Sequence, residues 1–504
     1  MQKKLRAIQY LLLVIPFLSF NYVLAEIQID TDIINIQYPL NNGSISSGKI
    51  LKKDKINSRV IDSSDAGSLL NYFVGSDNIS NAGSSGMPVI HGLADDRIKV
   101  RVDGMDLISG CASHSNSPFS YIDINNISKL KVFAGITPVS MGGDSIGGTV
   151  IVDSKAPEYS KSSEIIKKGS LRSSFRSNNQ AFGANINTVI ATDKLYFKYS
   201  GNYTDAKNYS SADDFKVGAT IVGRDWIDAA EAGSSAYKIS NHLFNLGSKK
   251  GSSELNLKVS IQHSPYQGLI NQRMDMTGND SRSFNLKYSD KFNWGNIEAR
   301  TYIESTDHAM NFGSDKQYWY PNNAPGNPMD SEGINLGFTV KADINLDENN
   351  TLTVGSEFQR YRLDDLWAAS GSGSMSPNTF VNINDGSRDR YDIYGELTNL
   401  WEPDLLISVG LRYGMVRMNA GEVHGYADLN TYGGMTNNQK ANSDTFNASD
   451  RTRTNHNWDL TALAEYIISP TLTSELGYAI KNRSPNLYER YTWSTWTMAA
   501  NMNN

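Results

Sequence analysis

The sequence predicts a compact α/β domain followed by an antiparallel β-barrel whose strands cross a membrane. Three observations predict this fold class. From about residue 169 onward, segments of roughly ten residues alternate apolar and polar side chains, the period-two pattern of transmembrane strands. The connections between these segments alternate between short turns and long loops. Beyond the N-terminus, no stretch of about 18 consecutive apolar residues predicts a transmembrane helix.

Residues 1–25 have the features of a secretory signal peptide. Three cations within the first six residues precede the apolar run Leu11–Phe20, which is too short to span a bilayer. Val23 and Ala25 form a small-residue cleavage pattern. We therefore expect an exported protein whose mature chain starts near Glu26.

Composition and motifs argue against several classes of protein. The formal net charge of −6 gives no support for a nucleic-acid partner. One cysteine in an exported chain excludes an internal disulfide and leaves a free thiol. The sequence has no G-x-S-x-G, H-E-x-x-H or Walker A motif, so we expect neither an enzyme nor a resident cofactor.

The mature chain divides into three regions. Residues 26–60 are polar and irregular, which predicts an extended periplasmic segment. Residues 61–160 are denser, with short β-like runs and Gly-rich turns, and predict the α/β domain. Residues 169–504 contain about 13 strand-like segments, the first near 169–177 and the last near 472–482. Because bacterial single-chain barrels have even strand numbers, this odd set predicts a partial barrel.

Three stretches resemble a known family. "PVIHGLADDRIKVRVDGMDL" (Pro88–Leu107) and "ISKLKVFAGITPVSMGGDSIGGTVIVDS" (Ile127–Ser154) resemble the plug domain of TonB-dependent outer-membrane receptors, although His91 stands where the family usually has Arg. "NRSPNLYERY" (Asn482–Tyr491) resembles a barrel motif of the same family. The resemblance implies a plug at 61–160 inside the barrel, a place in the bacterial outer membrane, and energy supplied by a TonB-type periplasmic protein.

The family's N-terminal box, on which the periplasmic protein pulls, has one loose match. It is "DTDIINI" (Asp30–Ile36), with Asp32, Ile33, Ile34 and Ile36 as the candidate residues. Such a box would act by adding a strand to its partner, so that main-chain hydrogen bonds supply most of the affinity. A plain linker is the competing interpretation.

The stretch around the single cysteine resembles the copper-receptor branch of the family. That branch carries a plug Cys with a Met four residues later, completed by a His-x-Met pair from the barrel. Cys111 matches the Cys, but the position four residues on is Ser115. His114 lies beside it and could substitute, while the pair is matched by His308 and Met310.

The chemistry of these side chains suits a soft metal. Thiolate, thioether and imidazole are the ligands that favour Cu(I). Residues i and i+2 of a strand share a face, so His308 and Met310 could act together. Met274 and Met276, in the preceding long loop, repeat the same spacing. The competing interpretation is that Cys111 is a buried packing thiol, because free cysteines are usually small hydrophobes in a core.

The function predicted from these features is energy-coupled uptake of a scarce ligand, with copper or another soft metal as the cargo. Expected partners are the TonB-type protein, outer-membrane lipid and a metal ion or metal chelate. The alternatives left open are import of an iron chelate, haem or cobalamin, a surface protein that does not transport, and a receptor fragment without function.

Overall fold

The computed structural model describes residues 49–503, apart from 81, 222–223, 271, 317–324, 374, 428–430, 433–434, 437–438 and 470–471. The predicted signal peptide and the candidate box residues Asp32, Ile33, Ile34 and Ile36 lie outside the described residues. The two largest sheets of the described chain are an N-terminal sheet of five strands and a second sheet of 13 strands, and three pairs of short strands form small sheets of their own.

The N-terminal domain is built on the five-stranded sheet, whose spatial order is β1-β6-β7-β4-β5. Its strands are β1 (Lys49–Lys52), β4 (Ile98–Val102), β5 (Met105–Asp106), β6 (Ile127–Phe133) and β7 (Gly148–Ser154). β4 and β7 are parallel, whereas the other neighbours are antiparallel. The remaining elements are α1 (Lys53–Asp62), the hairpin β2 (Ser76–Ser80) and β3 (Gly86–Ile90), and the 3-10 helices η1 (Ala66–Tyr72), η2 (Asp95–Arg97), η3 (Pro118–Tyr121) and η4 (Ile124–Asn126).

Apolar side chains of β6 and β7 form the centre of this domain. Leu130, Val150 and Val152 are each at most 1% exposed, and they pack in one cluster with residues of η1 such as Leu69 and Leu70. Their β-branched and Leu-rich runs favour strands that are covered on both faces. The predicted α/β domain therefore has a hydrophobic core of its own, built from short strands.

Residues 49–62 extend the domain beyond its predicted N-terminal boundary at residue 61. β1 pairs with β6, with Leu51 opposite Leu130, and α1 follows directly. The sequence pattern gave no sign of this, because "KILK" has only two apolar residues and its pairing partner lies about 80 residues away in the chain.

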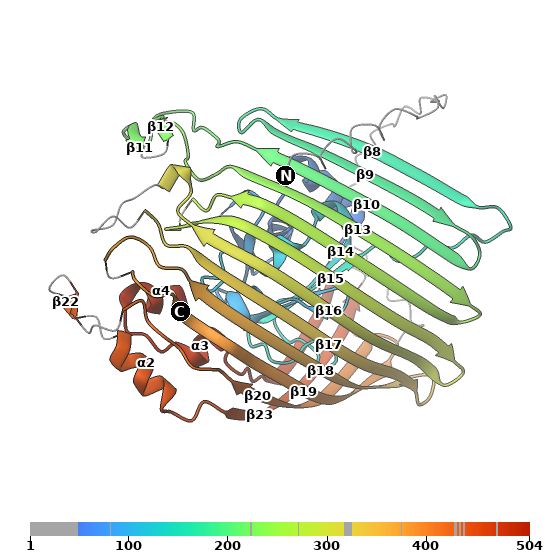
Figure 1. Cartoon of the computed structure of the whole chain (residues 1–504). Helices are drawn as coiled ribbons and strands as arrows, with labels where there is room; N and C mark the ends of the chain where they lie inside the picture. The colour runs from blue at the N-terminus through green and yellow to red at the C-terminus, as the bar shows by residue number, and fades with distance from the viewer. Residues whose placement is uncertain are drawn as a thin grey trace. The chain divides into compact units, whose positions relative to one another are not determined.

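The second sheet, called the wall sheet below, has antiparallel neighbours throughout and follows chain order from β8 to β24, as Figure 1 shows for most of its length. Its strand number equals the predicted 13. The strands are β8 (Ile166–Arg176), β9 (Ala181–Ala191), β10 (Leu195–Ala206), β13 (Tyr237–Lys250), β14 (Ser253–Gln267), β15 (Asp275–Phe292), β16 (Gly295–Asn311), β17 (Met329–Asn345), β18 (Asn350–Trp367), β19 (Phe380–Glu402), β20 (Leu405–Asn419), β23 (Arg453–Ser469) and β24 (Leu472–Ile480).

The smaller elements lie in the connections after residue 206 and, for α3 and α4, after the last wall strand. They are the short strands β11 (Ala219–Ile221), β12 (Arg224–Ile227), β21 (Thr431–Tyr432) and β22 (Met435–Thr436), the 3-10 helix η5 (Ser314–Lys316), and the helices α2 (Gln439–Asn447), α3 (Leu487–Tyr491) and α4 (Thr497–Asn503). No helix in the described part of the chain is long and apolar enough to cross a membrane.

The two faces of the wall sheet differ in chemistry. On β20, Leu411 is 50% exposed while its neighbour Arg412 is 2% exposed. The same alternation places Ile393 outward and Asp392 inward on β19. Since successive residues of a strand point to opposite faces, one face is apolar and exposed and the other is polar and covered. This is the alternation of a transmembrane barrel wall.

Connection lengths alternate as the sequence predicts. β13 and β14 are separated by two residues, β15 and β16 by two, and β19 and β20 by two. Gly251, at φ 62°, allows the first of these turns, because its left-handed backbone is strained for other residues. Loops of many residues follow β10, β16, β18 and β20. The long loops therefore gather at one end of the wall sheet.

The N-terminal domain contacts the polar face of the wall sheet. Arg101 of β4 donates to Glu357 of β18 at 3.0 Å, and Asp106 of β5 accepts from Arg390 of β19 at 2.6 Å. On another part of the wall, Asp103 accepts from Lys258 of β14 at 2.6 Å. These contacts join the two sheets through buried charge.

Candidate metal site

The loop that carries Cys111 is held by its own hydrogen bonds. Ser109 Oγ accepts from the Cys111 amide at 3.2 Å and donates to the Asn116 carbonyl at 2.7 Å. The His114 amide donates to the Cys111 carbonyl at 3.1 Å, and His114 itself has a φ of 53°. A compact turn of this kind fixes the direction of the Cys111 side chain.

Side chains from outside the loop hold it against the wall. The Gly110 carbonyl accepts from Ser331 Oγ of β17 at 2.7 Å and from the Tyr488 hydroxyl of α3 at 3.4 Å. Tyr488 belongs to the stretch Asn482–Tyr491 that resembles a barrel motif. Cys111, only 1% exposed, is thereby brought to the inner face of β16.

Cys111 meets both members of the predicted pair. Its thiol Sγ lies 3.4 Å from Met310 Sδ. His308, two residues earlier on β16, is on the same face and is 5% exposed. Its Nδ1 lies 3.1 Å from Asn279 Oδ1, and the imidazole also interacts with the Cys111 thiol. One thiol, one thioether and one imidazole thus converge.

The electrostatic setting favours the thiolate. Burial raises the pKa of the Cys111 thiol, but the nearby His308 imidazole and the hydrogen bonds from Ser113 and the Asn116 backbone together outweigh burial and lower the pKa to about 6. The thiol is therefore mostly ionised at neutral pH. Since the thiolate is the form that binds metal, Cys111 is already in the protonation state that a metal cation requires.

His114 makes a different contact. Its Nε2 lies 3.2 Å from Asp96 Oδ2, which also accepts from the Asn486 amide. Burial lowers the pKa of His114, but the Asp96 carboxylate outweighs burial and raises it to about 9. A protonated imidazole has no free lone pair for a metal. The structure therefore does not bring His114 into the site as a ligand in this arrangement.

Hydroxyl groups occupy the place where the copper-receptor branch would have its second plug sulfur. Ser113 Oγ lies 3.4 Å from Cys111 Sγ and 2.8 Å from Ser115 Oγ. Ser115 is 2% exposed. Any cation bound here would therefore lack a methionine from the plug loop and would have serine oxygens beside it.

Other methionines line the same region. Met276 of β15 and Met329 of β17 are the cross-strand partners of Met310, and both are at most 5% exposed. Met274 is 2% exposed and packs in the same apolar cluster as Cys111 and Met310. The sequence suggested Met274 and Met276 by spacing, whereas Asn279, which orients the imidazole, lay on the neighbouring strand and gave no sequence signal.

Aromatic rings of the long-loop end cover this cluster. Phe380 stacks on Trp367 with ring centroids 4.7 Å apart and on Trp493 at 4.9 Å. Tyr426 completes the group with a centroid 5.3 Å from that of Phe380. These rings share one apolar cluster with Cys111 and Met310, so the site is shielded from water in this state.

The site is not a conventional cluster of hard or borderline ligands. Within the described ranges, no group of three or more His, Cys, Asp or Glu side chains could hold a metal ion. The donor set at Cys111 is distinct because two of its three members are sulfur. Such a set suits Cu(I) and suits a hard cation such as Mg²⁺ or Ca²⁺ poorly.

Comparison with known proteins identifies the N-terminal domain. Residues 42–149 match the family model described as TonB-dependent Receptor Plug Domain. These residues are a TonB-dependent receptor plug domain. The predicted resemblance to TonB-dependent receptors is therefore confirmed, and the plug includes β1 and α1.

Solved structures share the fold of the plug and the wall sheet together. The copper transporter OprC has 18% identity and a TM-score of 0.71, with 88% of this chain and 66% of that chain covered. The FrpB iron transporter from Neisseria meningitidis (F3-3 variant) has 15% identity and a TM-score of 0.66, with 89% and 66% covered. A hemophore receptor HasR from Serratia marcescens, solved with its hemophore HasA and heme, has 16% identity and a TM-score of 0.64, with 91% and 66% covered.

These likenesses show the fold. The predicted fold class, a plug domain with an antiparallel barrel wall of 13 strands, is confirmed. The chain spans about two thirds of the length of the solved structures it matches. No curated protein sequence matches the chain. Because those structures differ in ligand, the likeness alone does not select a cargo.

Proposed function

We propose that this protein is an outer-membrane transport receptor that binds Cu(I) at Cys111, Met310 and His308 and passes it inward. The cargo is the substrate of the protein and not a resident cofactor. Energy would come from a TonB-type periplasmic protein acting on the segment that precedes β1, where the candidate box lies. The proposal includes no enzymatic step.

One observation carries this proposal. The plug thiol Cys111 Sγ and the wall thioether Met310 Sδ, from residues 199 apart in the chain, are 3.4 Å apart, and the buried His308 imidazole interacts with the same thiol. A packing thiol needs no such neighbours, since an apolar contact would suffice.

The position of the site also supports transport. Its ligands come from both the plug and the wall, so a cation bound there would connect the two. Movement of the plug away from β16 would separate Cys111 from Met310 and His308. A site that is divided by the moving part releases its cargo when that part moves.

Competition with a Cu(I) chelator under reducing conditions tests the binding. The purified full chain would be compared with Cys111→Ala, His308→Gln and Met310→Leu. We expect one tight Cu(I) per chain, and we expect each variant to lose at least the roughly 10–100-fold in affinity that removal of an outer-shell partner costs.

Met105→Leu is the matched control for Met310→Leu. Met105 is 6% exposed in the separate core of the plug, and the swap from Met to Leu conserves volume in both places. The control should bind Cu(I) as the unmodified chain does. If the unmodified chain binds no tighter than the three site variants, Cys111 is a packing thiol, and an iron chelate, haem or cobalamin becomes the cargo to test.

A further inference from the structure

The plug is fixed firmly to one side of the wall. Arg101 and Asp106 pair with Glu357 of β18 and Arg390 of β19, and all four side chains are at most 12% exposed. Asp144 pairs with Arg388 of β19 at 2.5 Å. Separating these groups would leave unpaired buried charges, which is costly. The β18–β20 side is therefore an unfavourable place for the plug to part from the wall.

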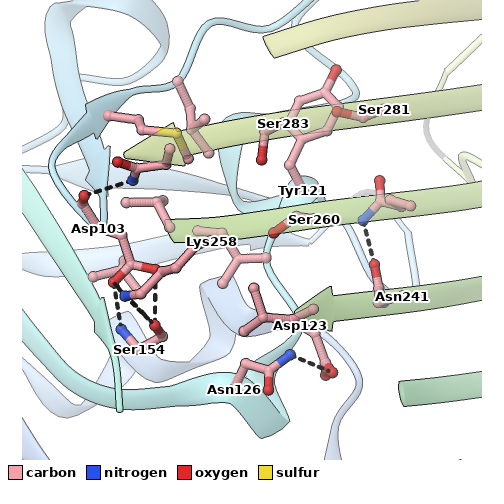
Figure 2. A pocket seen from close by; sticks show the side chains of 18 of the residues that line it. Asp103, Tyr121, Asp123, Asn126, Ser154, Asn241, Lys258, Ser260, Ser281 and Ser283 are labelled. Carbon is pink, nitrogen blue, oxygen red and sulfur yellow. Dashed lines mark hydrogen bonds and ion pairs between the residues drawn. The ribbon is translucent and has the colours of Figure 1, made fainter. Parts of the chain in front are cut away.

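The opposite side of the plug, called the hollow side below, holds more empty space than the β18–β19 side, where the described cavity measures about 80 Å³. A cavity of about 80 Å³ lies between the plug and strands β13 to β16, with Tyr121, Asp123 and Lys258 among its lining residues (Figure 2). A second cavity, of about 840 Å³, lies between the plug and strands β8 to β13. The two share Ile122, Asp123 and Asn241 as lining residues, so they adjoin. Both are large enough to hold water and carry polar groups in their lining.

Charge also distinguishes the two sides. The smaller cavity is lined by three carboxylates, Asp103, Asp123 and Glu304, and by one ammonium group, Lys258. A further cavity on the β18–β19 side is lined by three carboxylates and four cations, which are Asp96, Asp106, Asp144, Lys99, Arg388, Arg390 and Arg483. The smaller cavity thus has no excess of positive charge, whereas the cavity on the β18–β19 side has one cation in excess.

A short chain of polar side chains connects the metal site to the hollow side. Asn279, which bonds His308, accepts from the Asn116 amide at 2.9 Å, and the same amide donates to the Tyr121 hydroxyl at 3.0 Å. Tyr121 lines the smaller cavity, together with wall serines such as Ser281 (Figure 2). These amide and hydroxyl contacts connect His308 to the lining of the cavity.

We propose that the cargo leaves Cys111, Met310 and His308 past Tyr121 into the adjoining cavities between the plug and strands β8 to β16, while the plug stays fixed at β18–β20. This route depends on the proposed function, because it assumes that a cation is transported. The amides of Asn116 and Asn279 act as the gate. Opening it breaks hydrogen bonds between neutral groups, and the buried ion pair on this side is Asp103 with Lys258, against several pairs at β18–β20.

The wide cavity lies beside the part of the plug that a pull would reach first. Its lining includes Asn57 and Ser58 of α1, which directly follows β1 and the N-terminal segment. Arg172 and Arg176 of β8 also line it, with Asp123 as its carboxylate. Displacement of α1 would widen this side without touching the ion pairs of β18–β20.

Two disulfide locks test the route. Each lock is closed by a short reagent with two thiosulfonate groups, which links the two cysteines through reducible disulfides. Asn125→Cys with Asn202→Cys joins η4 to β10 on the hollow side, where Asn125 Nδ2 lies 3.3 Å from Asn202 Oδ1. Ser140→Cys with Glu396→Cys joins the plug to β19 on the fixed side, where Ser140 Oγ lies 2.8 Å from Glu396 Oε1. We expect the first lock to lower copper uptake by energised cells about tenfold, with recovery on reduction, and the second to leave uptake within about twofold. Cu(I) binding by the purified chains should be unchanged in both.

Other outcomes overturn the route. It is wrong if the fixed-side lock stops uptake, if both locks stop it, or if neither does. Loss of Cu(I) binding in the unmodified chain would instead defeat the proposed function, which the chelator competition detects separately.

Thiol labelling tests the route without reference to the cargo. Single cysteines at position 202 or 396, in a Cys111→Ser background, would be labelled in cells with and without the proton gradient. We expect energy-dependent labelling of Asn202→Cys and none of Glu396→Cys. Equal labelling of the two, or none at Asn202→Cys, overturns the route even if the disulfides fail to form.

Discussion

Asp106 is the plug residue whose replacement should disturb the plug–wall contact most. Its carboxylate accepts from Lys99 at 2.9 Å, Arg101 at 2.6 Å and Arg390 at 2.6 Å, and its side chain is 7% exposed. Burial raises the pKa of Asp106, but the three cations, Arg101 first, outweigh burial and hold it well below its usual range. The group is thus charged at neutral pH. Asp106→Asn removes one negative charge from among three buried cations.

The expected loss in the free energy of unfolding depends on which anionic partners the three cations retain. Removing one partner of a buried ion pair costs about 3–5 kcal/mol. Arg101 and Arg390 retain Glu357 at 3.0 and 3.5 Å, so we expect a loss near the lower end, about 3 kcal/mol. The free energy of unfolding, measured by denaturant in detergent micelles, is the appropriate readout. If the slope of the unfolding free energy against denaturant concentration is unchanged, the substitution has altered stability and not the surface exposed on unfolding.

Asp444→Asn is the matched control. Asp444 pairs with Lys440 on α2 at 2.8 Å, but the side chains are 61% and 48% exposed. Exposed pairs at this spacing contribute about 0.3–0.5 kcal/mol. If Asp106→Asn costs no more than Asp444→Asn, the charge cluster does not fix the plug to the wall, and the argument for a fixed side is refuted.

Three further predictions concern pH and the membrane. Because the pKa of Cys111 is about 6, Cu(I) affinity should be level above pH 6 and fall about tenfold for each pH unit below it, as chelator competition across pH would show; a level affinity down to pH 4 would contradict a thiolate ligand. The pKa of His114 is raised from 6.5 to about 9, so its pairing with Asp96 stabilises the fold fully below pH 6.5 and is lost as the pH rises through 9. The stability difference between the unmodified chain and His114→Gln should therefore be largest at low pH in denaturant titrations, and a constant difference would refute the pairing. Leu411→Arg places a charge on the outer face of β20 and should cost about 2–4 kcal/mol in lipid vesicles, whereas Leu411→Ile should cost little; equal effects would argue against a lipid-facing position.

The fold could be predicted from the sequence because its signals are local and repeated. The alternation of apolar and polar side chains along strands such as β20 is visible in consecutive residues, and every second connection between strands is a short turn. The strand number followed from the same pattern. β1 escaped prediction because four residues with two apolar side chains carry little information, and the strand exists only through its pairing with β6.

The site was predictable only in part. Cys111, His308 and Met310 could be named because their types and spacing match a known arrangement. His114 was an equally reasonable candidate, and its pairing with Asp96 could not be seen, because these residues are 18 apart with no helical or strand spacing between them. The position of Asn279 beside His308 depends on the register of β15 against β16, and no local sequence pattern determines that register.

X-ray absorption at the copper edge would test the central claim most directly. The full chain loaded with one equivalent of Cu(I) would be compared with Cys111→Ala and Met310→Leu. The proposal requires two sulfur neighbours and one nitrogen neighbour of the metal in the unmodified chain, with one sulfur lost in each variant. A spectrum with only nitrogen or oxygen neighbours, or one that is the same in all three proteins, would contradict a soft-metal site shared by plug and wall.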